Sequence, residues 1–171
     1  MSQFTWEKAH QTKVILPEEL ESKMSDVKRQ GFKLATLNGS FDLMHAGHLE
    51  IIYQASQVAD KLLVLLNSDT SIQQYKGKDR PLISLKYRIR MMAALGFVDF
   101  VSWFDETDPI QVLSKVKPDV HVNGAEYGSD CIEADCVKKN GGRIEIIQLV
   151  PGLSTSEIIK KIESNASSRR N

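Results

Sequence analysis

The sequence predicts one α/β domain in which about five parallel strands form a sheet with helices on both faces. Short apolar runs alternate along the chain with longer amphipathic segments, a pattern typical of parallel strands joined by helical crossovers. The apolar run at residues 62–67 shows no polar alternation, as expected for a strand that is covered on both faces. A length of 171 residues suits one domain with a sizeable core.

Each expected strand is a short apolar run between polar segments, and the helices are the amphipathic segments around these runs. The strands are expected at residues 33–37, 62–67, 98–103, 119–123 and 144–150. The helices are expected at residues 17–30, 48–59, 84–95, 109–116, 131–139 and 154–162. Residues 68–82 are polar and are expected to form a loop.

Start and stop signals bound these helices. Pro17 lies near the first position of the first helix, and Gly31 follows its end. Later stops are Gly96, Lys117-Pro118 and Asn140-Gly141-Gly142. No internal repeat or proline- or glycine-rich linker divides the chain, so we expect residues 1–163 to form one domain with its core at 30–163. The polar, basic residues 164–171 are expected to be a flexible tail.

The composition excludes several classes of partner. Lysine plus arginine and aspartate plus glutamate both number 22, so the chain lacks the basic excess of a general nucleic-acid or membrane-surface binder. No apolar run is long enough to cross a bilayer, and the first residues do not resemble a signal peptide, so a cytoplasmic location is expected. Cys131 and Cys136 match neither a redox pair nor a zinc knuckle and are expected to be reduced thiols.

The most informative segment joins the first strand to the next helix and reads Asn38-Gly39-Ser40-Phe41-Asp42-Leu43-Met44-His45-Ala46-Gly47-His48. A strand-to-helix junction in a parallel sheet is a common phosphate-binding place, because backbone N–H groups and the positive helix end face the ligand. His45 and His48 there could neutralise charge on a phosphorus undergoing substitution. Gly47 would allow close approach of a phosphate to the backbone.

Three alternatives stay open for this segment. The two histidines could be a structural pair. They could also bind zinc, for which Asp42 is the sole nearby third ligand. The turn at Gly39, Phe41 and Asp42 could either line a nucleotide site or serve as a helix-capping region with a packed aromatic ring.

Other loops offer phosphate-binding groups at the same edge of the sheet. Lys76 lies in a basic loop after the second strand, and Arg88 could add a second cation from the next helix, although helix arginines often form plain salt bridges. Gly124 and Glu126 follow the fourth strand. Hydroxyl groups follow the fifth strand at Ser154, Thr155 and Ser156, where a capping box of Ser154 with Glu157 is the structural alternative.

These motifs, taken in order, resemble the nucleotidyltransferase superfamily whose hallmark is His-x-Gly-His. The resemblance is greatest to the adenylyltransferase domain of ADP-heptose synthases, and it covers about residues 30–163. Its further motifs are Asn67-Ser68-Asp69, Lys76-Gly77 with Arg80-Pro81, Tyr87-Arg88, Val98-Asp99 and Gly152-Leu153-Ser154-Thr155-Ser156. The resemblance implies a Rossmann-like fold, usually dimeric.

The resemblance also implies a reaction. A substrate phosphate would attack the α-phosphorus of a nucleoside triphosphate in line, with Mg²⁺, and release pyrophosphate. His45 and His48 would stabilise the transition state, while Lys76 would hold substrate or triphosphate oxygens. The nucleotide would be bound by both histidines and by Asn38, Gly39, Phe41, Asp42, Gly47, Arg88, Gly124, Glu126, Ser154, Thr155 and Ser156. Asp42 and Lys76 would also contact the acceptor.

Several positions depart from the relatives. Leu149 stands where cytidylyltransferases for glycerol phosphate have an arginine, which favours ATP and a heptose 1-phosphate as substrates. Heptose-type enzymes usually have lysine, glycine and aspartate where this chain has Asn123, Ala125 and Glu126, and cysteine at Ser40. Two alternatives therefore remain, a CTP-dependent enzyme for glycerol 3-phosphate or another polyol phosphate, and a nucleotide-binding module without activity.

Overall fold

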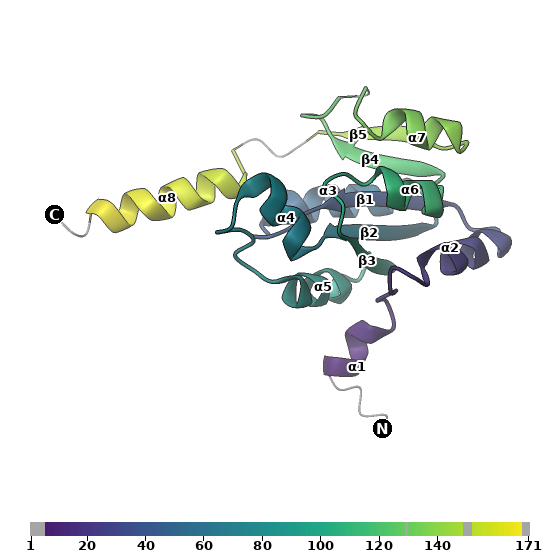
Figure 1. Cartoon of the computed structure of the whole chain (residues 1–171), viewed down its shortest axis with the longest axis horizontal. Helices are drawn as coiled ribbons and strands as arrows, with labels where there is room; N and C mark the ends of the chain where they lie inside the picture. The colour runs from purple at the N-terminus through teal and green to yellow at the C-terminus, as the bar shows by residue number, and fades with distance from the viewer. Residues whose placement is uncertain (1–5, 129, 149–151, 169–171) are drawn as a thin grey trace.

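Five parallel strands form one sheet at the centre of the molecule, in the order β3-β2-β1-β4-β5 (Figure 1). The computed structural model describes residues 6–128, 130–148 and 152–168. The strands are β1 (Leu34–Gly39), β2 (Lys61–Asn67), β3 (Phe100–Phe104), β4 (Val120–Gly124) and β5 (Arg143–Ile147). The predicted fold class is confirmed.

The sheet order places a crevice at the middle of the sheet. β1 pairs with β2 on one side, with Leu34 opposite Lys61, and with β4 on the other, with Thr36 opposite His121. From β1 the chain continues to β2 and β3 on one side of the sheet and then crosses to β4 on the other side of β1. The connections that leave β1 and β4 therefore run in opposite directions, and a ligand crevice opens between the carboxyl ends of these two strands.

Helices cover both faces of the sheet. Those in the described residues are α1 (Trp6–Gln11), α2 (Leu20–Arg29), α3 (Ala46–Ser56), α4 (Asp69–Lys76), α5 (Leu85–Ala94), α6 (Ile110–Val116), α7 (Ala134–Lys139) and α8 (Thr155–Ser168). Leu62, Val64 and Leu66 pack with α3 and α5, whereas Leu63 and Leu65 pack with α2, α6 and α7. This two-sided burial explains why β2 has no polar residues between its ends.

Two helices were not expected from the sequence. The segment predicted as a polar loop contains α4, which begins where the Ser68 hydroxyl accepts a hydrogen bond from the Ser71 N–H group. α4 buries Ile72 as its one large apolar side chain, so it has no amphipathic repeat that a sequence pattern could reveal. α1 is also additional and precedes the first predicted helix.

Some boundaries differ from the predictions. α2 begins at Leu20 rather than at residue 17, because residues 17–19 form a turn in which the Glu19 N–H group bonds the Leu16 carbonyl. α8 continues through Ser168, into the segment expected to be a flexible tail, and the Ser164 and Ser168 hydroxyls bond carbonyls one turn earlier. The expected end of β5 at residues 149–150 lies outside the described residues. No helix in the described part of the chain is long and apolar enough to cross a membrane.

Candidate active site

A cavity of about 240 Å³ lies at the carboxyl ends of β1 and β4, on the face covered by α3. Most of the predicted site residues line it. Those that do are Asn38, Gly39, Phe41, His45, Gly47, His48, Lys76, Gly124, Glu126, Ser154 and Thr155. Its other lining residues are Leu37, Ser40, Ile51, Asn123, Tyr127 and Leu153. The fold thus brings residues from five separate segments around one space.

The two histidines form the start of α3. His45 is the N-terminal cap residue with extended backbone, and its N–H group donates to Nδ1 of His48 at 3.3 Å. The two rings stack with centroids 3.9 Å apart. A Cβ atom at Gly47 would lie 3.1 Å from the His45 ring, so glycine leaves room for this imidazole across the helix start.

His48 is neutral in the ligand-free protein. Burial lowers its pKa to about 4, with smaller contributions from the charges of His45 and Lys76. Because Nδ1 accepts a backbone hydrogen bond, the ring proton lies on Nε2, which leaves Nε2–H as a donor. Burial also lowers the pKa of His45, and its Nδ1 is buried without a hydrogen-bond partner among the described residues.

The turn after β1 is held in an unusual conformation. Phe41 has a φ of 44°, in the left-handed region that non-glycine residues rarely adopt. Its ring meets the His48 ring edge to face at 5.3 Å, and a Cβ atom at Gly39 would lie 2.9 Å from it. Gly39 therefore allows the Phe41 ring to pack beside the histidine, and the strain lies at the site itself.

Lys76 reaches the cavity from the end of α4. Its Nζ donates to the Ser40 hydroxyl at 3.1 Å. Burial lowers its pKa, and the nearby charge of Arg80 lowers it further. A lysine held on a neutral hydroxyl keeps its charge available for an incoming anion.

The loop after β4 and the start of α8 complete the walls. A Cβ atom at Gly124 would lie 2.3 Å from a carboxylate oxygen of Glu126, so the glycine lets this side chain fold back over the strand end. The Ser154 hydroxyl accepts the N–H group of Glu157 and caps α8, while Thr155 donates to the Leu43 carbonyl at 3.3 Å. Ser156 is exposed and does not line the cavity, contrary to the sequence prediction.

Asp42 is also placed differently from the prediction. The residue is 2% exposed, and its carboxylate accepts hydrogen bonds from Arg80 Nε at 2.7 Å and from the N–H groups of Leu82 and Ile83. These donors hold its pKa below the usual value despite burial, and the carboxylate is ionised. Asp42 therefore anchors the loop at residues 80–83 rather than lining the cavity.

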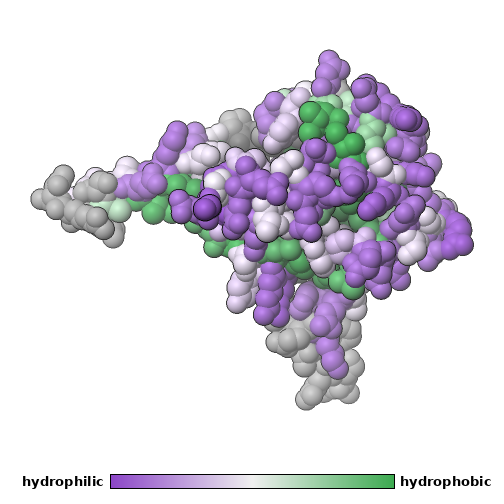
Figure 2. Space-filling view, viewed as in Figure 1, coloured by the Kyte–Doolittle hydropathy of each residue, from purple (hydrophilic) through white to green (hydrophobic). Residues whose placement is uncertain are grey.

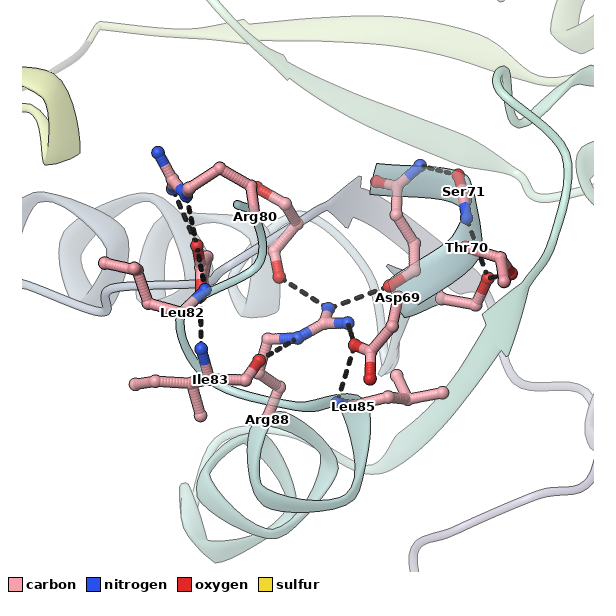
Figure 3. A network of polar contacts seen from close by, with 12 residues as sticks. Asp69, Thr70, Ser71, Arg80, Leu82, Ile83, Leu85 and Arg88 are labelled. Atoms are coloured by element: carbon pink, nitrogen blue, oxygen red, sulfur yellow. Dashed lines mark hydrogen bonds and ion pairs between the residues drawn. The ribbon is translucent and has the colours of Figure 1, made fainter. Parts of the chain in front are cut away.

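Arg88 also differs from the sequence prediction of a nucleotide-binding arginine (Figure 3). Its side chain is fully buried and donates to the carbonyls of Ile83, Ser40 and Asn67 at 2.8–2.9 Å. It also pairs with Asp69 at 2.7 Å. A guanidinium that is so engaged has little capacity left for a phosphate. Arg88 joins the ends of β1 and β2 to α5 and does not line the cavity.

The described residues contain no preformed metal cage. No group of three or more histidine, cysteine, aspartate or glutamate side chains in residues 6–128, 130–148 and 152–168 could hold a metal ion. The zinc alternative is therefore not supported, because Asp42 faces Arg80 instead of the histidines. Mg²⁺ needs fewer protein ligands, since it is often held by substrate phosphates and water.

Several site residues were not predicted from the sequence. Tyr127 lines the cavity, and Ser40 holds Lys76. Each follows the end of a strand, which is the signal that could have found them. Leu37, Ile51 and Leu153 line the cavity with apolar side chains that the sequence does not distinguish from core residues.

Comparison with known proteins identifies relatives of this chain. A family model described as cytidylyltransferase-like matches residues 36–168. The chain is 39% identical over 154 residues to the bifunctional protein HldE of Syntrophotalea carbinolica, covering 90% of this chain and 31% of that protein. It is 44% identical over 139 residues to HldE of Paramagnetospirillum magneticum, covering 81% of this chain and 28% of that protein. The chain therefore spans about a third of the length of these curated relatives.

Solved structures show the same fold. The lipopolysaccharide core biosynthesis protein from Thermoplasma volcanium matches with a TM-score of 0.57 and 26% identity, over 70% of this chain and 98% of that one. The pantoate-beta-alanine ligase from Francisella tularensis, complexed with beta-gamma ATP and beta-alanine, matches with a TM-score of 0.56 and 15% identity, over 86% of this chain and 76% of that one. At the latter identity the likeness concerns the fold alone.

Proposed function

The chain belongs to the cytidylyltransferase-like family of nucleotidyltransferases, and we propose that it transfers AMP from ATP to a heptose 1-phosphate with release of pyrophosphate. One observation carries this proposal. The cavity at the β1–β4 crevice collects the two histidines, Lys76 and the start of α8 around a single space. This combination of donors suits a triphosphate whose α-phosphorus is attacked by a second phosphate.

The proposed step forms one bond and breaks one. An oxygen of the acceptor phosphate bonds to the α-phosphorus of ATP, while the bond from that phosphorus to the oxygen bridging to the β-phosphate breaks, and pyrophosphate leaves. Nε2–H of His48 donates to the α-phosphate oxygens as charge shifts toward the leaving group. The ammonium of Lys76 holds oxygens of the reacting phosphates, and the backbone N–H groups at the start of α8 hold the β- and γ-phosphates.

Charge stabilisation by His48 would begin from a neutral ring. A pKa of about 4 means that the free protein presents a neutral donor, and a bound polyanion would raise that pKa by stabilising the charged form. The proposal therefore assigns to His48 the role of a positioned hydrogen-bond donor. His45, stacked on it at 3.9 Å, would complete the pair at the α-phosphate.

The choice of substrates rests on relatives. The HldE proteins match at 39–44% identity, and the motifs of the chain resemble the adenylyltransferase domain of ADP-heptose synthases. Leu149, which favours ATP over CTP by this resemblance, lies outside the described residues. Mg²⁺ carried mainly by the triphosphate, a homodimer and a cytoplasmic location are parts of the same proposal.

A CTP-dependent transfer to glycerol 3-phosphate or another polyol phosphate is the second candidate. The loop after β4 favours it, because Asn123, Ala125 and Glu126 depart from the heptose-type pattern and line or border the cavity. An inactive nucleotide-binding module is the third candidate, which the intact pair of histidines and Lys76 disfavours.

An assay of pyrophosphate release decides between these candidates. ATP and CTP are each combined with Mg²⁺ and a panel of acceptors that includes a heptose 1-phosphate, a hexose 1-phosphate and glycerol 3-phosphate. We expect turnover with ATP and the heptose 1-phosphate, and mass spectrometry should identify ADP-heptose as the product. Turnover confined to CTP and glycerol 3-phosphate would establish the second candidate, and nucleotide binding without pyrophosphate from any pair would establish the third.

A further inference from the structure

A second cavity, of about 230 Å³, adjoins the first at the carboxyl ends of the strands. The two share six lining residues, among them Lys76 and Asn38. Residues found in the second cavity alone come from β2, from α4 and from the starts of α6 and α7. They are Asn67, Tyr75, Thr107, Pro109, Ile132 and Glu133. The second cavity thus lies toward the opposite face of the sheet from α3.

Strand alternation sends three asparagines to this second cavity. Leu34, Leu63 and Leu65 pack toward α2, α6 and α7, and the period of two places Asn38 and Asn67 on that same face. Val120 and Val122 pack toward α3, so Asn123 also faces α6 and α7. β2, β1 and β4 are neighbours in the sheet, and the three amides therefore stand side by side at the strand ends.

These amides have hydrogen-bonding capacity left. Asn67 Nδ2 donates to the Ser71 hydroxyl at 3.0 Å, and Asn123 Nδ2 donates to a carboxylate oxygen of Glu133 at 3.2 Å. The side-chain carbonyl oxygen of Asn38 is buried and has no hydrogen-bond partner among the described residues. This oxygen can accept a hydrogen bond from a ligand.

Glu133 is the most unusual group in the second cavity. It is only 6% exposed, yet no lysine or arginine of the described residues forms an ion pair with it. Its carboxylate accepts hydrogen bonds from the amide of Asn123 at 3.2 Å and from the thiol of Cys131, which leaves further lone pairs open. A buried carboxylate is costly unless donors satisfy it, so the remaining lone pairs call for hydroxyl or N–H groups of a ligand.

We propose that the second cavity is the acceptor subsite and that Glu133 with the three asparagines selects an acceptor rich in hydroxyl groups. The inference rests on the proposed function, which supplies the nucleotide in the first cavity. Hydroxyl groups can donate hydrogen bonds to Glu133, and they can both donate to and accept from the asparagine amides. A sugar or polyol therefore offers a hydrogen-bond partner to each of these four side chains. The acceptor phosphate lies at the boundary, where Lys76 lines both cavities.

Glu133 and the three asparagines also disfavour acceptors that lack hydroxyl groups or carry a negative charge next to them. A carboxylate on the acceptor would meet the charge of Glu133, and an alkyl chain would leave the amide and carboxylate groups without partners. Sites built to bond a hydroxyl discriminate strongly against analogues that lack it, because buried polar groups are then unpaired.

Glu133→Gln tests the proposal, because glutamine keeps the shape and removes the charge. Steady-state kinetics are measured with ATP, Mg²⁺ and a sugar 1-phosphate or, as a hydroxyl-poor acceptor, ethyl phosphate. We expect the KM for the sugar phosphate to rise about tenfold or more, with the KM for ATP changed less than about twofold, on the scale of one charged hydrogen bond. The preference for the sugar phosphate over ethyl phosphate should fall by a similar factor. The matched control is Asp135→Asn, an exposed carboxylate of α7 outside both cavities, which should leave every parameter unchanged.

The outcomes separate the two proposals. A sugar-phosphate KM that is unchanged in Glu133→Gln, or an ATP KM that rises instead, overturns the acceptor subsite while the proposed function stands. If Glu133→Gln does not fold, the test uses the wild-type enzyme with a series of sugar phosphates that each lack one hydroxyl group. At least one of them should show a kcat/KM about tenfold or more below that of the parent sugar phosphate. Equal kcat/KM values for all of them would overturn the proposal. If the wild-type enzyme turns over no sugar phosphate, the proposed function fails. Calorimetry then tests the cavity, where binding of the sugar phosphate supports the subsite and absence of binding overturns it.

Discussion

His48 combines two properties that are normally opposed. It is buried and neutral, which lowers its capacity to attract an anion before binding, yet its Nε2–H group is positioned as a donor because Nδ1 is held by the N–H group of His45. The Phe41 ring and the stacked His45 ring fix its orientation. A donor fixed in advance needs no reorganisation during the reaction, which is the basis of electrostatic catalysis.

We predict that His48→Ala lowers kcat by at least about a hundredfold, the scale of losing one preorganised donor to a developing negative charge. The KM for ATP should change far less. Pyrophosphate release measures the effect, and circular dichroism checks that α3 remains folded. His10, a histidine of α1 outside both cavities, offers the matched control His10→Ala. A His48→Ala enzyme with most of its turnover would contradict the assigned role.

Two buried histidines make the stability depend on pH. The pKa of His48 and that of His121, whose ring bonds the Thr36 hydroxyl at 2.8 Å, are both lowered by burial to about 4. In the unfolded chain both would titrate near pH 6.5. As the pH falls below about 6.5, the unfolded state binds protons that the folded state does not, so the free energy of unfolding falls until about pH 4.

The expected loss is at most about 1.4 kcal/mol per pH unit for each histidine. Urea denaturation at pH 7.5 and pH 5 measures it without added nucleotide. In His48→Asn the loss between these two pH values should be clearly smaller than in the wild-type protein, because His48 no longer contributes while His121 and His45, whose pKa values are also lowered by burial, still do. Equal losses in the two proteins would show that His48 is not buried as described.

At the scale of elements, Arg88 connects the segments that surround the candidate active site through hydrogen bonds made outside the cavity. It bonds carbonyls from the turn after β1, from the end of β2 and from the loop before α5, and it pairs with Asp69 at the start of α4. Asp69 in turn accepts the N–H group of Leu85 (Figure 3). The network joins four segments, and two of its partners, Ser40 and Asn67, line the cavities.

We predict that Arg88→Met lowers the free energy of unfolding by about 3–5 kcal/mol, because three backbone carbonyls packed around a fully buried side chain lose their hydrogen-bond donor, whereas the partly exposed Asp69 remains hydrated. Lys86→Met, an exposed cation of the same helix, is the control and should change stability by less than about 0.5 kcal/mol. The comparison is made without nucleotide. If Arg88→Met kept the wild-type stability and only raised the KM for ATP, the sequence prediction of a nucleotide-binding arginine would be correct instead.

At the scale of the whole molecule, α8 extends away from the sheet (Figure 1). Figure 2 shows hydrophobic residues along this helix beside a largely hydrophilic surface. Ile162 is 60% exposed and shares a face of the helix with Ile158 and Ile159. Exposed apolar surface on a projecting helix is typical of a contact with another chain.

We predict that the protein is a homodimer in which α8 is covered by the second copy. Ile162→Lys should shift the molecular mass in light scattering toward that of a monomer, because a charge would be buried in the interface. Lys161→Ala, one position earlier and exposed, should leave the mass unchanged. A monomeric wild-type protein at all concentrations would show that a second copy does not cover α8.

The sequence was informative where a pattern depends on neighbours along the chain. The five strands and the faces of the sheet follow from apolar runs, and the junction that carries His45 and His48 follows from its position after the first run. α4 was missed because it buries one large apolar residue, and a helix without an amphipathic repeat has no local signature. The loops after β1 and β4 were expected at one edge, and they do line one cavity.

The local sequence by itself determined the fold class, the class of enzyme that the motif indicates, and the edge of the sheet where the cavity lies. Only the tertiary structure decided which charged groups face a ligand. Asp42 and Arg88 carry the right charges for a nucleotide site, but each is engaged mainly by partners that are 19 or more residues away in the sequence. Glu133, in contrast, is left with few donors beside a cavity. Charge is a property of the residue, whereas its availability depends on which distant segments the fold brings against it.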